Sequence, residues 1–264
     1  HIPMNPFNYH INLPSYCIIC NDRFRVMNHL GNGAFGSVYS VMDLLNGHRF
    51  ALKVAANMPD AVRQLEVELR VLTQLQEHPG FLRLHCGGLL DVKGHKALLL
   101  DLKDCTLLDY VYDKGAALDA TETAEVAIRL LHQLEKLHGI GIVHCDIKVD
   151  NVLVDESQCG QFPSLHIIDF GLALNYYEEQ RRGRYLVNRK RDLNDLAYML
   201  VQIIGVSNNG AIDGIMQTIS AFIRYVNKLG YDETPDYEIW RNNFQKFTRT
   251  ELPSKHRRKT CQIL

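Results

Sequence analysis

The stretch Val143–Asn151, with the sequence VHCDIKVDN, decides how the rest of the chain is interpreted. It fits the pattern H-x-D-x-K-x-x-N, and the tripeptide DFG at 169–171 follows after the mostly apolar run LHII at 165–168. A carboxylate that accepts a hydroxyl proton, a neighbouring lysine, and an Asn and an Asp that bind Mg²⁺ are the groups that phosphoryl transfer requires. Positioned cations stabilise the negative charge on the transferred group, so little covalent chemistry is required of the protein.

A glycine-rich segment lies upstream at 31–38, with the sequence GNGAFGSV. It fits G-x-G-x-x-G-x-V, and glycine allows a backbone to approach a phosphate closely or to adopt a positive φ. The pattern alone is weak, because a tight hairpin turn or a dinucleotide site would also explain it. A dinucleotide site needs a helix that begins at the last glycine. The residues after Gly36, SVYSV, are instead typical of a strand, which argues against that interpretation.

The segment ALKV at 51–54 follows one strand later and places Lys53 between apolar neighbours. Such a lysine is either an ordinary surface lysine or one that pairs with a carboxylate on the following helix. Glu66 and Glu68 are both candidates for that partner. The apolar residues of the helical stripe flank both of them, so periodicity does not choose between them.

Hydrophobic periodicity predicts an α+β fold, with a small β-rich half that carries one helix and a larger helical half. Strands are predicted in short apolar runs at 24–30, 36–44, 48–55, 81–84 and 97–102. Helices are predicted where apolar residues recur three and four positions apart, at 60–76 and 121–137, and mostly from 193 onward. The first 21 residues, rich in Pro and Asn, are expected to form an extended arm.

The composition of the 264 residues is that of an ordinary globular protein, with 46% hydrophobic and 22% charged residues. This much apolar side chain excludes disorder as the dominant state. Lys and Arg total 29 against 30 for Asp and Glu, so the overall charge does not indicate nucleic acid as a partner. No apolar run approaches the length needed to span a bilayer. No cleavable signal is visible, and because the chain begins with His we expect the native N-terminus to lie elsewhere.

Seven scattered cysteines are typical of a reducing compartment rather than of a disulfide framework. Cys17 and Cys20 form one C-x-x-C, but no second pair or Cys/His cluster follows to complete the usual four zinc ligands. We therefore interpret them as ordinary thiols and expect an intracellular protein, cytoplasmic or nuclear.

These motifs together resemble those of the eukaryotic protein kinases over residues 24–264. Within the kinases, the chain looks like the casein kinase 1 group. LDLKDCTL at 100–107 resembles that group's hinge, NRKRDLNDL at 188–196 its S-R-R-D-D-L-E-S-L helix, and LGYDETPDY at 229–237 its late P-D-Y motif. Two further stretches, 39–54 and 67–76, look most like the tau-tubulin kinase branch, with the vaccinia-related kinase branch as the alternative.

The resemblance implies the bilobal protein kinase fold and its boundaries. We expect an N-terminal extension at 1–21 and a kinase domain at 22–264. The domain is expected to consist of an N-lobe at 22–101, a hinge at 101–104 and a C-lobe at 105–264.

The resemblance also implies a role for each motif residue. Asp146 is expected to be the catalytic base and Lys148 to support the γ-phosphate. Lys53 is expected to hold the α- and β-phosphates and to pair with Glu68, which the family alignment selects over Glu66. The residues expected to bind ATP are Leu30, Gly31, Asn32, Gly33, Ala34, Phe35, Gly36, Ser37, Val38, Ala51, Lys53, Leu100, Asp101, Leu102 and Leu153.

The remaining roles concern the metal and the catalytic loop. Asn151 and Asp169 are expected to hold Mg²⁺, with Mn²⁺ as an alternative, and Asp192 is expected to brace the catalytic loop. All the motif residues that catalysis needs are present, so the resemblance implies an active kinase with MgATP and protein substrates. Lys148 after the D-I pair matches the serine/threonine form of the loop.

Two departures from the family pattern concern regulation and substrate binding. Cys145 stands where most kinases have an Arg that grips an activation-loop phosphate, so we expect activity that does not depend on such a phosphate. Asp192 follows Asp169 by only 23 positions, and no A-P-E follows. Either the sequence lacks loop residues or this is a shortened kinase, and the alternative function is an ATP-binding pseudokinase or scaffold.

Basic residues gather in that short segment and at the end of the sequence. A cluster of Arg and Lys between 181 and 191 is either a solvated face or an anion site for acidic or phosphorylated substrates. The last residues, CQIL at 261–264, loosely fit a prenylation signal behind a polybasic run. Membrane association is expected if Cys261 is prenylated.

Overall fold

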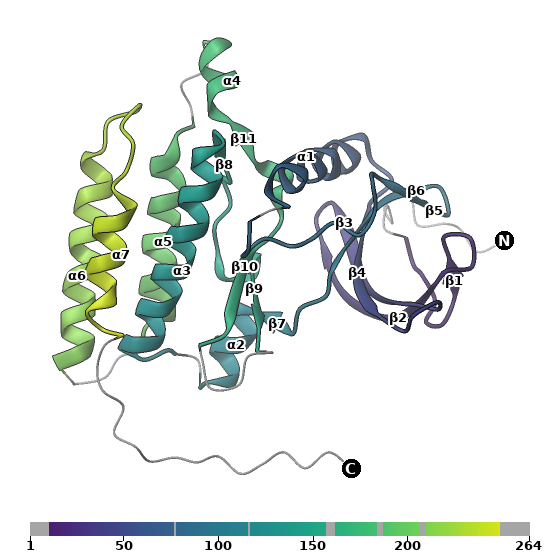
Figure 1. Cartoon of the computed structure of the whole chain (residues 1–264), viewed down its shortest axis with the longest axis horizontal. Helices are drawn as coiled ribbons and strands as arrows, with labels where there is room; N and C mark the ends of the chain where they lie inside the picture. Colours follow the sequence, from purple (N-terminus) through teal and green to yellow (C-terminus); the bar gives the residue numbers. More distant parts are fainter. Residues whose placement is uncertain are drawn as a thin grey trace.

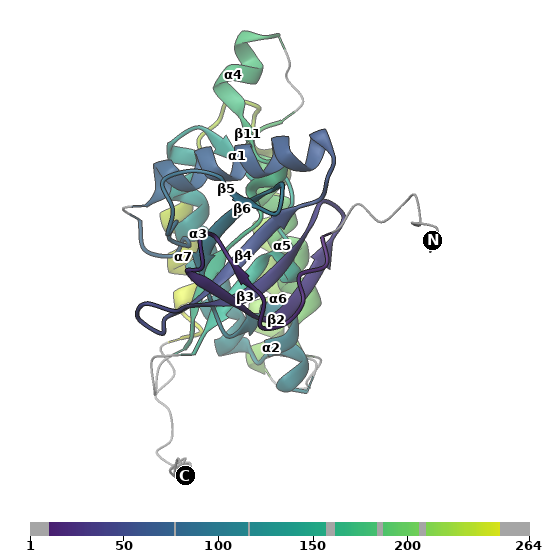
Figure 2. The same ribbon diagram turned by 90° about the vertical axis from the view of Figure 1, so that its right-hand side faces the viewer.

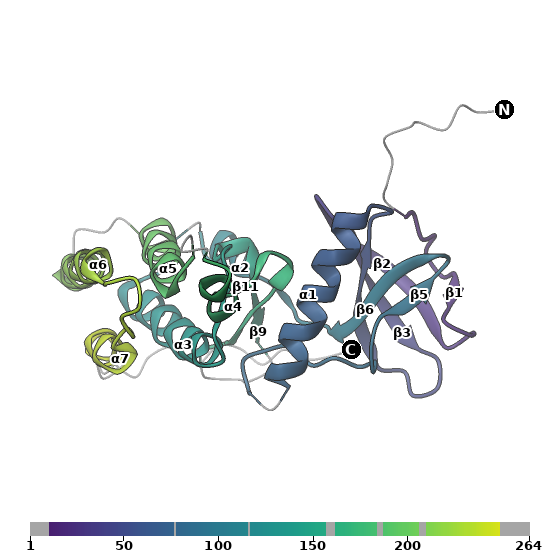
Figure 3. The same ribbon diagram turned by 90° about the horizontal axis from the view of Figure 1, so that it is seen from above.

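The computed structural model describes residues 11–76, 78–115, 117–156, 162–183, 187–205 and 210–248. They form two lobes, a β-rich N-terminal lobe and a helical C-terminal lobe (Figure 1). Seen from above, α1 (Pro59–Leu75) lies between the sheet of the first lobe and the helices of the second (Figure 3). The α+β architecture predicted from the sequence is confirmed.

The N-terminal lobe is built on an antiparallel sheet with the strand order β1-β2-β3-β4-β6-β5. The strands are β1 (Ile18–Ile19), β2 (Phe24–Gly33), β3 (Gly36–Asp43), β4 (Arg49–Ala55), β5 (Leu90–Val92) and β6 (His95–Asp101). Side chains that alternate along the pleat meet on one face, where Val26, Val41 and Leu52 are fully buried. The three predicted strands between 24 and 55 are confirmed.

Helix α1 begins with Pro59, which the first turn of a helix tolerates because its missing N–H would have no partner there. The buried face carries Leu65, Leu72 and Leu75, spaced so that they share one stripe. Glu68 lies on the same buried face. A carboxylate in that position requires a partner inside the protein.

One prediction for this lobe was wrong, and one point that the sequence left open is answered. Residues 11–21, part of the expected extended arm, pack on the lobe: β1 extends the sheet and Leu13 is buried against it. The Tyr39 hydroxyl fixes the segment by donating to the Ile11 carbonyl at 2.7 Å. The segment 81–84 is not a strand, because Leu84 makes a single bridge to Leu100 while β5 supplies the edge beside β6.

The C-terminal lobe contains longer helices and two small sheets. Its helices are α2 (Leu107–Asp113), α3 (Ala120–Gly139), α4 (Tyr176–Arg181), α5 (Arg189–Ile203), α6 (Gly210–Lys228) and α7 (Tyr237–Gln245), with 3₁₀ turns η1 (Val149–Asn151) and η2 (Phe170–Leu172). The small sheets are β7 (Cys105–Thr106) with β9 (Val152–Asp155) and β10 (Ser164–Ile167), and β8 (Ile142–Val143) with β11 (Leu174–Asn175). Helix α4 projects beyond the other helices in Figures 1 and 2.

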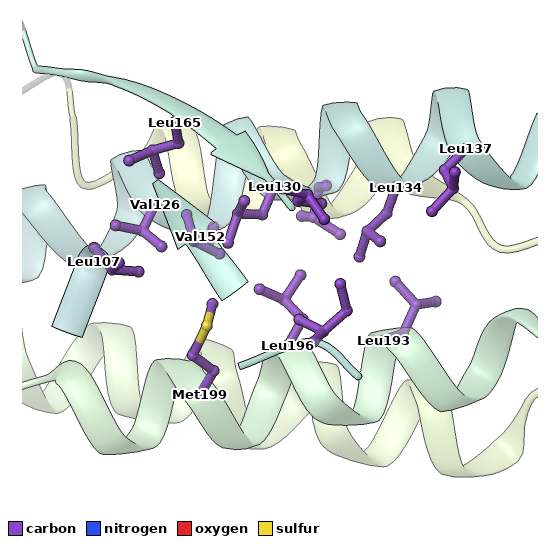
Figure 4. Packing of buried hydrophobic residues seen from close by; sticks show 14 of the residues in the cluster. Leu107, Val126, Leu130, Leu134, Leu137, Val152, Leu165, Leu193, Leu196 and Met199 are labelled. Carbon is purple, nitrogen blue, oxygen red and sulfur yellow. The ribbon is translucent and has the colours of Figure 1, made fainter. Parts of the chain in front are cut away.

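The core of this lobe lies between α3 and α5 (Figure 4). Leu130 and Leu134 of α3 face Leu193 and Leu196 of α5, and all four are buried. Burying each such side chain contributes about 1.5–3 kcal/mol. The short strand β8 leaves α3 and leads directly into the VHCDIKVDN stretch, so this core holds the predicted catalytic loop in place. Among the described residues, no helix has both the length and the apolar character needed to cross a membrane.

Candidate active site

A cleft of about 310 Å³ lies between the lobes. It is lined by most of the residues expected to bind ATP, namely Leu30, Gly31, Gly33, Ala34, Phe35, Gly36, Val38, Ala51, Lys53, Leu100, Asp101, Leu102 and Leu153. The predicted Glu68, Asn151 and Asp169 line it too. Asn32, Ser37, Asp146 and Lys148 are not among its lining residues.

The glycine-rich segment forms the β2–β3 hairpin above this cleft. Gly36 is needed for close packing: a Cβ there would lie 2.3 Å from the Val54 carbonyl oxygen of β4. A Cβ at Gly31 would meet nothing within 4 Å. Neither residue has a positive φ. Gly36 therefore allows β3 to pack closely against β4, whereas the described structure gives no packing reason for Gly31.

Lys53 connects the two lobes through two carboxylates. Its Nζ donates to Glu68 Oε2 at 2.5 Å and to Asp169 Oδ1 at 2.9 Å. Burial alone would lower the pKa of Lys53, but the two carboxylates outweigh it and raise that pKa. Glu66 is exposed, so the structure makes the choice between the two glutamates that periodicity left open.

The two carboxylates respond differently to their surroundings. Burial raises the pKa of Glu68, and the charge of Lys53 offsets this only in part. Burial would also raise the pKa of Asp169, but the charge of Lys53 and its hydrogen bond outweigh this effect and lower that pKa. Asp169 thus keeps a negative charge in the cleft, as a cation-binding carboxylate must.

The predicted catalytic loop is anchored on Asp192 at the start of α5. Asp192 Oδ2 accepts the His144 N–H at 2.7 Å, and Oδ1 accepts the Cys145 N–H at 2.8 Å. Cys145 has a φ of 72°, an unusual conformation for a residue with a side chain. Asp192 also accepts from His138 Nε2 at 2.9 Å. Burial opposes the charge of Asp192, but these donors lower its pKa, so the fully buried carboxylate can hold the strained loop.

Asp146 presents a partly exposed carboxylate next to the cleft residue Asn151. Its Oδ2 accepts from Lys148 Nζ at 2.7 Å and from Asn151 Nδ2 at 2.8 Å, and its side chain is 30% exposed. Because the Asn151 amide nitrogen is directed at Asp146, the amide oxygen is left to bind other groups. The sequence-predicted Asp146, Lys148 and Asn151 therefore lie together.

Aromatic packing joins this loop to the N-terminal lobe. Phe170 is fully buried, with its ring centroid 5.0 Å from that of His144 and 6.1 Å from that of Phe81. The Asp146 N–H donates to His144 Nδ1, so Nε2 carries the proton that is donated to the Ile168 carbonyl. Burial lowers the pKa of His144, consistent with this neutral ring. The preceding Asp169 has a φ of 65°, which directs its carboxylate to Lys53 while Phe170 is buried.

The basic cluster of the short segment is largely used for structure. Arg189 is buried, with its guanidinium 4.6 Å from the Tyr176 ring centroid and 2.7 Å from the Tyr176 hydroxyl oxygen. Arg191 donates to the Cys145 carbonyl at 2.8 Å and Lys190 to the Asn227 carbonyl at 2.7 Å. These contacts weaken the interpretation of the cluster as an anion site. Arg184 of that cluster lies outside the described residues, as do residues 1–10 and the Cys261 motif.

Cys145 itself is not a reactive thiol. It is buried, and burial raises its pKa to about 12 with a smaller contribution from Asp192. Because the thiolate is the nucleophile, this side chain acts as a neutral filler at the position where most kinases carry Arg.

Sequence reasoning missed two groups that border the site. Gln64 lines the cleft one turn before Glu68, and a Cβ at Gly171 would lie 3.0 Å from its Oε1. Its spacing of four from Glu68 places it on the same face and could have identified it. Tyr237 reaches His138 Nδ1 at 2.5 Å and so supports the Asp192 network from α7, a contact that no local sequence signal predicts.

Residues 24–207 match the protein kinase domain. The chain belongs to the protein kinase family. A probable serine/threonine-protein kinase of Arabidopsis thaliana is 33% identical over 166 residues, which cover 61% of this chain and 22% of that protein. Casein kinase I homolog 2 of Saccharomyces cerevisiae is 26% identical over 179 residues, covering 67% of this chain and 32% of that protein.

A third relative, casein kinase I homolog 2 of Schizosaccharomyces pombe, is 24% identical over 275 residues, covering 86% of this chain and 62% of that protein. The kinase chain thus spans less than two thirds of the length of each of these relatives. A protein kinase domain in general uses ATP and Mg²⁺.

The residues of the cleft fit this metal. Asp169 offers a carboxylate that keeps its charge and Asn151 an amide oxygen, and both line the cleft. Mg²⁺ prefers hard oxygen ligands and usually takes one or two from protein while substrate phosphates and water supply the rest. The described residues contain no cluster of three or more His, Cys, Asp or Glu that could hold a metal ion.

Proposed function

We propose that this chain is an active serine/threonine protein kinase that transfers the γ-phosphate of MgATP to a protein hydroxyl. The observation that carries the proposal is the double contact of Lys53, which reaches Glu68 at 2.5 Å and Asp169 at 2.9 Å across the interlobe cleft. Catalysis of phosphoryl transfer depends on positioning and electrostatics, and this contact fixes the cation and the metal-binding carboxylate together.

The proposed roles are those that the family resemblance implies, and the hydrogen bonds among the groups support them. Asp146 takes the proton of the substrate hydroxyl, the hydroxyl oxygen forms a bond to the γ-phosphorus, and the bond to the β–γ bridging oxygen breaks to leave ADP. Lys148, 2.7 Å from Asp146, is placed to stabilise the transferred group. Mg²⁺ held by Asn151 and Asp169 would neutralise developing charge on the phosphate oxygens, and Mn²⁺ is an alternative. The glycine-rich hairpin and the hinge residues 101–102 enclose the nucleotide.

We further propose that activity needs no phosphate on the activation segment. Cys145 offers no guanidinium for such a phosphate, and its backbone is already fixed by Asp192. Arg189, within the short segment, is buried on Tyr176. Both observations support a catalytic loop whose position does not depend on a modification.

Membership of the casein kinase 1 group is also proposed, supported by the two yeast casein kinase I homologues and by the three sequence stretches noted above. The tau-tubulin kinase branch stays a prediction. A preference for acidic or phosphorylated substrates rests on this group resemblance. The local cations give it little support, although Arg181 is exposed and its guanidinium reaches a backbone carbonyl rather than a carboxylate.

One observation favours a second function, that of an ATP-binding scaffold. The interval between Asp169 and Asp192 is short and contains the projecting helix α4, which leaves little chain for a peptide platform. Transfer of labelled phosphate from MgATP to casein separates the two functions. An active kinase labels casein, whereas a scaffold gives no label although MgATP raises its melting temperature.

A further inference from the structure

The stretch LGYDETPDY at 229–237 ends in Tyr237, the first residue of α7, which does not line the proposed ATP cleft. Its hydroxyl lies 2.5 Å from Nδ1 of His138 on α3, and Nε2 of the same ring lies 2.9 Å from Oδ2 of Asp192 on α5. Helix α3 lies beside both α5 and α7 (Figure 3). Asp192 in turn accepts two backbone N–H groups of the catalytic loop. Hydrogen bonds in series therefore join Tyr237 to that loop.

The hydrogen bonds of this series indicate where its protons lie. Burial opposes the charge of Asp192, but the surrounding donors lower its pKa, so the carboxylate is ionised and only accepts hydrogen bonds. Nε2 of His138 therefore carries a proton and donates it. Burial raises the pKa of Tyr237, so its hydroxyl keeps its proton and donates to Nδ1, which is the acceptor of a neutral ring.

Nδ1 of His138 depends on this hydroxyl. The residue is 1% exposed, and among the described residues Tyr237 is the hydrogen-bond partner of that nitrogen. A buried polar atom without a partner costs free energy, which the protein lowers when the group moves or changes its protonation. Either response alters the hydrogen bond that His138 gives to Asp192, because both nitrogens belong to one rigid ring.

The catalytic loop is sensitive to such a change at Asp192. Cys145 has a φ of 72°, and a residue in this conformation persists only where its surroundings fix it. One oxygen of Asp192 accepts the Cys145 N–H, and the other accepts from His138 and from a second N–H of the loop. Because Asp146 follows Cys145 directly, a carboxylate that turns would move the proposed base. A misplacement of about 1 Å can lower a rate by about 10²-fold.

Helix α7 has other contacts that hold it in place. Arg241 pairs with Glu135 of α3 at 2.6 Å. Trp240 packs on Phe222 of α6, with ring centroids 5.0 Å apart. The ring of Tyr237 is itself buried in the same core. A phenylalanine in place of Tyr237 should therefore keep the packing of α7 and lose only the hydrogen bond to α3.

We propose that Tyr237 is a positioning residue for phosphoryl transfer, which holds the catalytic loop in place through His138 and Asp192. This role deepens the proposed kinase function and rests on it. It gives the end of the stretch 229–237 a part in the reaction, although the residue lies outside the cleft.

The first test is the activity of Tyr237→Phe on casein. We expect kcat to fall by about tenfold or more, while KM for MgATP changes by less than about twofold, since neither Tyr237 nor His138 lines the cleft. In a His138→Gln background, the same substitution should change kcat by less than about twofold, because its effect passes through the ring. The matched control is Tyr225→Phe, which removes the hydroxyl that accepts the Asp236 N–H at 2.7 Å beside the start of α7 and should keep the wild-type kcat.

The second test is amide hydrogen exchange without nucleotide, which does not depend on activity. In Tyr237→Phe, the His144 and Cys145 amides should exchange about tenfold or more faster than in the wild type. The buried Phe222 amide of α6 should change no more than it does in Tyr225→Phe. Equal acceleration of both sets would indicate a general loss of stability and would overturn the proposal.

Two further outcomes would also overturn it: loop amides that exchange as in the wild type, and a kcat that Tyr237→Phe leaves unchanged. A wild type that transfers no phosphate would contradict the proposed kinase function instead. The exchange rates alone would then decide whether Tyr237 holds the loop.

Discussion

Replacing Lys53 with methionine should destabilise the chain in a way that grows with pH. The change leaves Glu68, whose side chain is 3% exposed, without its cation, while the Asp169 side chain is 46% exposed and stays solvated. Removing one partner of a buried ion pair costs about 3–5 kcal/mol. Glu68 can limit that cost by taking up a proton.

The sign of the pH effect follows from linkage. Burial already raises the pKa of Glu68, and loss of Lys53 raises it further. The folded state then binds more protons than the unfolded state, so stability falls as pH rises above the unfolded pKa of about 4.3. The penalty at higher pH is that of a buried carboxylate left without its partner, about 3–5 kcal/mol.

The assay is urea unfolding of the wild type, Lys53→Met and Lys53→Met/Glu68→Gln at about pH 5 and about pH 8. The free energy of unfolding of the single variant should be slightly below that of the wild type at the lower pH and about 3 kcal/mol below it at the higher pH. The double variant has no charge to bury, so at the higher pH its free energy of unfolding should recover most of this difference. It should still transfer no phosphate. A deficit that does not change with pH, or a double variant no more stable than the single one at the higher pH, would refute the reasoning.

Three further predictions concern the surroundings of the site. Gly36→Ala should lower the free energy of unfolding by about 1–3 kcal/mol, because its Cβ would lie 2.3 Å from a backbone oxygen of β4. It should also reduce the rise in melting temperature that MgATP causes. Gly31→Ala, which has open space around its Cβ, is the control, and equal melting temperatures of the two variants would contradict this prediction. Iodoacetamide at mildly alkaline pH should label the more exposed Cys17 and leave Cys145 unmodified, because burial raises the pKa of Cys145 to about 12. Mass spectrometry measures both. Early labelling of Cys145 would show that its thiol is accessible. Asp192→Asn should lower the free energy of unfolding in urea by about 2–4 kcal/mol. The reason is that an amide cannot accept from all three N–H groups that the carboxylate binds. A decrease below about 1 kcal/mol would mean that other contacts hold the loop.

Local patterns predicted the parts of the fold that depend on nearby residues. The strands between 24 and 55 and the helices α1 and α3 follow from periodicity, which packing then reinforced. The N-terminal segment was different, because a Pro- and Asn-rich stretch carries no strand signal. It is fixed by Tyr39, which lies 28 residues away from its acceptor Ile11.

The candidate site likewise combines features that nearby residues determine with features that depend on distant parts of the chain. Residues that fit short motifs, such as Asp146 and Asn151, could be named from the sequence, but periodicity could not choose Glu68 as the partner of Lys53. The basic residues of the short segment looked like a surface patch because a sequence does not show that Arg189 is buried on Tyr176.

The central claim is that the Lys53–Glu68–Asp169 arrangement and Asp146 serve phosphoryl transfer. The most direct measurement is transfer of labelled γ-phosphate from MgATP to casein and to the chain itself, with Asp146→Asn and Lys53→Met beside the wild type. The account predicts labelling on serine or threonine by the wild type, and a loss of about 10²-fold or more when the general base is removed. Labelling that survives Asp146→Asn would contradict the assignment of the base, and a wild type that binds MgATP without transferring phosphate would establish the scaffold instead.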